Sequence, residues 1–123
     1  MNTWNKIALL GGDGRQRWTA QRLAERGAEV AVWGLPEALS ATASVVRTTD
    51  WQSAICGAKA ILLPLPVSTD GIRLNCGLSA QEGKELRLTH LLEAVDREQP
   101  IFGGRFPPSF KESAEEKEIR LFD

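Results

Sequence analysis

The sequence is short of the residues that build metal sites and membrane spans. Its 123 residues include two cysteines and one histidine. Cys56 and Cys76 lack the C-x-x-C spacing of a zinc site, so we expect free thiols and no metal centre. No apolar run approaches the length of a membrane span, and the first residues lack the apolar core of a signal peptide. These absences predict a cytoplasmic protein that does not enter a membrane.

An excess of charge of one sign is also missing. The chain carries 15 Lys and Arg against 16 Asp and Glu, a net charge of -1 with the signs interspersed. Nucleic acid and acidic lipid surfaces select a basic footprint, so we expect neither as a partner. A hydrophobic content of 42% is ordinary for a globular chain of this length. We therefore predict one domain, residues 1–123.

A glycine turn near the start is the most informative stretch. Residues 6–10 are an apolar run typical of a buried strand, and Gly11, Gly12 and Gly14 follow it directly. Asp13 suits the N-cap of a helix that begins there, and Gln16, three residues on, completes a capping box. Strand, turn and helix open a βαβ unit, whose ligand crevice lies at the carboxyl ends of the strands.

Arg15 projects from the first turn of that expected helix. The N–H groups of a helix N-terminus already favour an anion, and a guanidinium beside them is able to grip a carboxylate or phosphate with two hydrogen bonds. A capping role for Asp13 and Gln16 is compatible with this. The turn therefore predicts an anion site built from Gly12, Asp13, Arg15 and Gln16.

The turn lacks two features of a dinucleotide site. The G-x-G-x-x-G fingerprint needs a third glycine, where this chain has Arg17, and an acid at the end of the next strand, where it has Trp33 and Gly34. No G-x-x-x-x-G-K-[ST] phosphate loop occurs in the sequence. We therefore expect no cofactor on this chain itself.

The remaining pattern alternates strands and helices. We expect strands at 28–34, 44–47, 58–63, 100–104 and 118–123, and helices at 50–55, 89–96 and from 107. Thr89 is the expected cap of the third of the four helices, and residues 35–43 form a connection or a short helix. This order predicts an α/β fold of three layers (α/β/α), a doubly wound, mostly parallel sheet that is Rossmann-like or flavodoxin-like.

Two further segments leave the sheet at the same rim as the glycine turn. The run 63–66 carries two prolines and leads to Ser68, Asp70 and Gly71, and 102–104 ends in paired glycines. The long polar segment between 64 and 77 is of a kind that is often functional. Asp70 suits a β-turn, as Asp13 suits a cap; either carboxylate is also a candidate proton acceptor.

In order and spacing, the three rim segments and the closing Leu121 and Phe122 resemble the N-terminal domain of the dipicolinate synthase A chain, of endospore-forming bacteria. The G-G-D-x-R-Q element at 11–16 is the most specific match. The resemblance implies a further, C-terminal domain that holds NAD or NADP. It also implies oxidation of a dihydro- or hydroxytetrahydro-dipicolinate to dipicolinate during sporulation, in the mother-cell cytoplasm, with the B chain of dipicolinate synthase as partner and a possible homo-oligomer.

On this resemblance the substrate is a dicarboxylate. Arg15 then holds one carboxylate, Ser68 donates nearby and Arg105 is the candidate for the other carboxylate. Two other classes stay open, a nucleotide- or flavin-binding module, and an interaction domain that docks a partner protein through tryptophans such as Trp4, Trp18 and Trp51.

Overall fold

Six short strands form one parallel sheet. The structure is a computed structural model, and it describes residues 6–12, 14–34, 45–75 and 85–123. The strands are β1 (Lys6–Leu10), β2 (Glu29–Trp33), β3 (Val45–Arg47), β4 (Ala60–Leu62), β5 (Ile101–Phe102) and β6 (Leu121–Phe122). Each lies inside a range that the sequence predicts as a strand.

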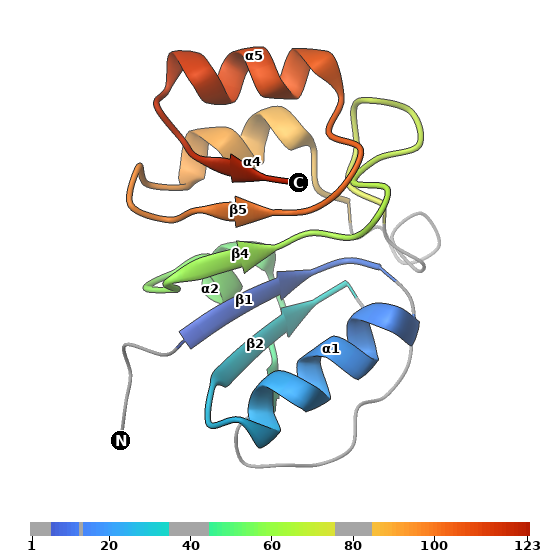
Figure 1. Ribbon diagram of the computed structural model, residues 1–123, viewed down its shortest axis with the longest axis vertical. Helices are drawn as coiled ribbons and strands as arrows, with labels where there is room; N and C mark the ends of the chain where they lie inside the picture. Colours follow the sequence, from blue (N-terminus) through green and yellow to red (C-terminus); the bar gives the residue numbers. More distant parts are fainter. Residues whose placement is uncertain (1–5, 13, 35–44, 76–84) are drawn as a thin grey trace.

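Helices cover the two faces of this sheet unequally. Helix α1 (Gly14–Glu25) lies against one face and contacts β2 and β3. Helices α2 (Trp51–Ile55), α4 (Leu88–Ala94) and α5 (Pro108–Glu116) lie on the other. Figure 1 shows α1 in front of β2, with α2 behind the sheet. The predicted three-layer α/β/α fold is confirmed.

The strand order decides between the two expected variants of this fold. The order is β3-β2-β1-β4-β5-β6, with every neighbouring pair parallel. This is the order of dinucleotide-binding folds, whereas a flavodoxin-like sheet interleaves its strands differently. The chain is therefore Rossmann-like, and its direction of winding reverses between β1 and β4.

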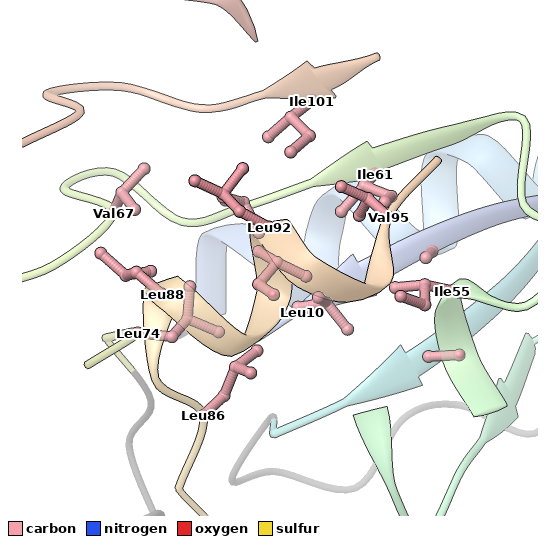
Figure 2. Packing of buried hydrophobic residues seen from close by; sticks show 14 of the residues in the cluster. Leu10, Ile55, Ile61, Val67, Leu74, Leu86, Leu88, Leu92, Val95 and Ile101 are labelled. Atoms are coloured by element: carbon pink, nitrogen blue, oxygen red, sulfur yellow. The ribbon is translucent and has the colours of Figure 1, made fainter. Parts of the chain in front are cut away.

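The larger part of the core lies between the sheet and α2, α4 and α5. Figure 2 shows Leu88 and Leu92 of α4 gathered with Ile61 and Ile101 of the sheet. The smaller part lies under α1, where Leu9, Ala20, Val30 and Val32 are buried. Since parallel strands buried on both faces need apolar residues at successive positions, β1, β2 and β4 lack strict alternation.

Two helix starts test the capping predictions. Asp50, the first residue of the predicted helix 50–55, caps α2, because its Oδ1 accepts from the Ser53 N–H at 2.7 Å. The prediction that Thr89 caps α4 is wrong, since that helix begins at Leu88 with Arg87 in the cap position. Leu88 is buried and its N–H donates to the Ile72 carbonyl at 2.9 Å, so packing and backbone pairing set this start.

Two segments outside the six-stranded sheet pair with each other. Residues 72–74 and 86–88 form an antiparallel contact through a bridge between Arg73 and Arg87, supported by the Leu74 N–H donating to the Leu86 carbonyl. The expected cap at Asp13, the connection 35–43 and Cys76 lie outside the described residues. Among the helices of the described ranges, none is long and apolar enough to cross a membrane.

Candidate ligand-binding cleft

A cleft of about 440 Å3 opens at the carboxyl ends of β1, β4 and β5. This rim cleft sits where the winding of the sheet reverses, which is the general ligand position in open α/β folds. Its volume falls within the range of roughly 300–1,000 Å3 found for small-molecule sites. The segments that the sequence predicted to share a rim therefore meet. The rim cleft is lined by Gly12, Arg15, Gln16, Leu63, Pro64, Leu65, Asn75, Gly103, Gly104 and Asp123.

The glycine turn forms one wall of the rim cleft. Gly12 has φ +101°, in the region that favours glycine, and a Cβ there would collide with the side chain of Gln16. Gln16 thus folds back over the turn, and its buried Nε2 has no hydrogen-bond partner within the part of the chain that the structure describes. Buried amide nitrogens are nearly always paired. This donor is a candidate for a ligand oxygen.

Residues 64–75, here called the strap, form the opposite wall. The Val67 N–H donates to the Gly104 carbonyl at 3.0 Å, and the Asn75 N–H donates to the Val67 carbonyl at 2.9 Å. The strap reaches the glycine turn through the Gly12 N–H, which donates to the Asn75 carbonyl at 3.0 Å. Three strand exits are therefore joined by backbone hydrogen bonds into one frame.

The same contacts test whether the turn fits a dinucleotide. Gly12 is the first glycine of the partial fingerprint, and a pyrophosphate bound at this turn would need backbone that it can approach and N–H groups that are free to donate to it. Here Gln16 covers Gly12, and the Gly12 N–H is already bonded to Asn75. At the end of β2, the ribose position holds Trp33, which is buried. The residues of this turn do not fit NAD or NADP, despite the strand order.

Arg15 lies at the edge of the rim cleft, on the first turn of α1. Its Nη2 donates to the Leu65 carbonyl at 3.1 Å, which holds the guanidinium between the glycine turn and the strap. Arg15, Gln16 and Gly12 are the predicted anion-site residues that the structure brings together. Asp13, the fourth, lies outside the described residues.

Ser68 and Asp70 are placed in a closed turn of the strap. Asp70 Oδ1 accepts from the backbone N–H groups of Ile72 and Arg73, at 2.8 and 2.9 Å. These bonds, with that from Arg73 first, hold the pKa of the Asp70 carboxyl well below its usual range. The Ser68 hydroxyl accepts from the Gly71 N–H and donates to the Arg73 carbonyl.

Such a carboxylate is a weak proton acceptor, because a general base works best with a pKa near the working pH. The predicted catalytic role of Asp70 therefore has no support from the geometry. Ser68 and Asp70 are not among the described residues that line the rim cleft. Arg105 is exposed, has φ +57° and is also outside the described lining. The binding roles of Ser68 and Arg105 stay predictions.

Asn75 and Asp123 were not predicted as part of a site. Asn75 is half-buried, and its Nδ2 donates to the Pro66 carbonyl at 3.3 Å. Asn75 lies in the long segment between 64 and 77 that was expected to be functional, but only the path of the strap shows that this residue reaches Gly12.

Solved structures of known proteins share the fold of this chain. The A chain of dipicolinate synthase from Bacillus subtilis has a TM-score of 0.77 and 21% identity, covering 98% of this chain and 40% of that chain. The corresponding protein from Bacillus halodurans gives 0.77 and 18% over the same shares. This chain thus spans about two fifths of the length of these relatives. Among curated proteins, no sequence matches it.

A more distant likeness extends to dehydrogenases. A D-isomer specific 2-hydroxyacid dehydrogenase from Xanthobacter autotrophicus, solved with NADPH and MES, has a TM-score of 0.57 and 15% identity, covering 98% of this chain and 50% of that one. At these identities the solved structures show a shared fold.

The sequence itself matches a family profile along nearly its whole length. The profile describes the N-terminal domain of the dipicolinate synthase A chain and matches residues 6–123. This range includes the glycine turn, the strap and all six strands. The chain belongs to the family of dipicolinate synthase A-chain N-terminal domains.

Proposed function

We propose that this domain binds the dicarboxylate substrate of an NAD(P)-linked oxidation that forms dipicolinate during sporulation. The substrate is a dihydro- or hydroxytetrahydro-dipicolinate, and a second, C-terminal domain of the same protein holds NADP or NAD. The observation that carries the proposal is the rim cleft. At the N-terminus of α1 it has Arg15 and the Gln16 amide nitrogen, which finds no hydrogen-bond partner among the described residues.

The chemistry of the rim cleft suits a carboxylate. A helix N-terminus and a guanidinium both favour an anion, and a carboxylate oxygen would also satisfy Gln16 Nε2. Leu63, Pro64 and Leu65 supply an apolar wall for a ring. Oxidation of the dihydro ring removes one hydride, which NAD(P)+ accepts, and one proton; a hydroxytetrahydro substrate loses water as well.

The division of labour follows from the glycine turn. Because the turn does not fit a dinucleotide, the cofactor must be supplied from outside this domain. A two-domain arrangement does this if the cofactor domain faces the rim cleft. The B chain of dipicolinate synthase and a homo-oligomer remain proposed partners.

Titration of the 123-residue chain with dipicolinate, followed by NMR amide shifts, tests the proposal. We expect shifts at Gly12, Arg15 and Gln16 with dipicolinate and none there with NADPH. Arg15→Ala should remove the dipicolinate shifts, whereas Arg26→Ala, an exposed arginine just beyond α1, should keep them. Shifts with NADPH alone would instead support a nucleotide-binding module.

Catalysis gives a second readout in the full-length protein. There Arg15→Ala should raise KM about tenfold or more, since a hydrogen bond to a charged group contributes about 1.5–3 kcal/mol. An unchanged KM would contradict the assignment of Arg15 to the substrate.

A further inference from the structure

One row of side chains runs across the sheet on the face that carries α1. In register, Val32 lies beside Leu9, Leu9 beside Leu62, Leu62 beside Phe102, and Phe102 beside Phe122. Neighbours in a parallel register point to the same face. The exposed fraction rises along the row, from 1% at Val32 and 0% at Leu9 to 38% at Phe102 and 43% at Phe122.

The exposed fraction rises along the row because α1 covers only one part of this sheet face. Figure 1 shows α1 in front of β2, and within the described ranges no helix stands in front of β4, β5 and β6. Helices α4 and α5, which join these strands, pack their buried residues with Ile61 and Ile101 on the opposite face. Phe102 and Phe122 therefore form an exposed apolar surface, here called the bare half-face, and the half-buried Leu62 stands at its border with the part under α1.

The bare half-face adjoins the rim cleft. Phe102 is followed by Gly103, and Phe122 by Asp123, and both following residues line the rim cleft. The two phenyl rings stack at a centroid distance of 4.9 Å, so they form one continuous apolar unit. A body seated on this surface would stand directly beside the rim cleft.

The size of the surface indicates what kind of partner fits it. Two rings exposed by about two fifths offer of the order of 200 Å2, whereas a stable complex between free proteins buries roughly 800 Å2 on each partner. A covalently attached segment needs much less area, because attachment gives it an effective concentration in the millimolar range. The surface is thus too small for a free partner and sufficient for a tethered one.

We propose that the bare half-face is the docking surface for the polypeptide that follows residue 123 in the full-length protein. The matched family is an N-terminal domain, and the chain spans 40% of its solved Bacillus relatives. The inference rests on the proposed function in assuming a C-terminal domain. An apolar segment from that domain covers Phe102 and Phe122 and thereby sets the cofactor domain against the rim cleft.

Thiol labelling measures this cover directly. In a background with Cys56→Ser and Cys76→Ser, Phe122→Cys and, separately, Phe102→Cys are labelled with a maleimide in the 123-residue chain and in the full-length protein. We expect both positions to react at least tenfold more slowly in the full-length protein. The matched control is Val46→Cys, an apolar sheet residue with 48% exposure on β3 at the opposite edge, whose rate should stay equal.

The outcomes separate the possible occupants. Equal rates at position 122 in the two lengths would overturn the inference, and Phe102→Cys decides if Phe122→Cys does not fold. A rate in the 123-residue chain that falls with protein concentration would also overturn it, in favour of a second copy. Labelling requires neither substrate nor activity. A chain that fails to bind dipicolinate but shows the protection would refute the proposed function and leave the docking surface standing.

Discussion

Two halves of one sheet face differ in cover although they share one residue pattern. Under α1, Leu9 and Val32 are sealed, while in the same register row Phe102 and Phe122 are exposed by about two fifths. All four side chains are apolar, so composition does not separate the halves. The position of a single helix does. An apolar sheet residue therefore indicates that a face is to be covered, and the tertiary structure shows whether this domain covers it.

The largest loss of stability is expected when a side chain in the covered half is shortened. Leu9→Ala should lower the free energy of unfolding by about 2–5 kcal/mol, because it leaves a cavity between β1 and α1. Urea denaturation followed by tryptophan fluorescence measures the loss. A loss below about 1 kcal/mol would mean that α1 does not seal this half.

The glycine turn between β1 and α1 is the next test. Gly12→Ala should cost about 1–3 kcal/mol, because its φ of +101° disfavours a side chain and Gln16 occupies the place of the new Cβ. Gly71→Ala is the matched control, since Gly71 has φ +81° but open space around its Cβ position. Equal losses in urea denaturation would remove the role assigned to Gln16.

Truncation in the bare half should matter less. Phe102→Ala in the 123-residue chain is expected to cost about 1 kcal/mol, mainly the stacking on Phe122. In the full-length protein the same change should cost more, because the docked segment is lost as well. Denaturation of both lengths checks this, and an equal cost would contradict the docking inference.

The smallest effect concerns the strap and depends on pH. The pKa of Asp70 is lowered in the folded state, so its charged form stabilises the fold above the unfolded pKa of about 4, and this contribution is lost as the pH falls below that value. Asp70→Asn should therefore lower the urea midpoint at pH 7 and have less effect at pH 3. Glu112→Gln, on the exposed side of α5, serves as a control. A shift that is the same at both pH values would mean that the charge of Asp70 does not hold the turn.

Local chemistry made much of the fold predictable. The apolar run 6–10, the glycines after it and the cap at Asp50 act over a few residues, and the structure confirms β1, α1 and α2 at these places. The start of α4 was missed, because Leu88 is fixed by distant partners that outweigh the capping preference of Thr89. Of the predicted site, Gly12, Arg15 and Gln16 meet in the rim cleft. The side chains of Ser68 and Asp70 instead accept hydrogen bonds from backbone N–H groups within the strap.

Residue type and short spacing are sufficient to predict most of the elements, the rim at which their loops emerge and the incomplete dinucleotide fingerprint. The Rossmann strand order, the hydrogen bond from Gly12 to Asn75 and the bare half-face are visible only in the folded chain. These depend on which distant segments come to lie side by side. Packing over the whole sheet determines which segments become neighbours, and no short stretch of sequence is sufficient to predict it.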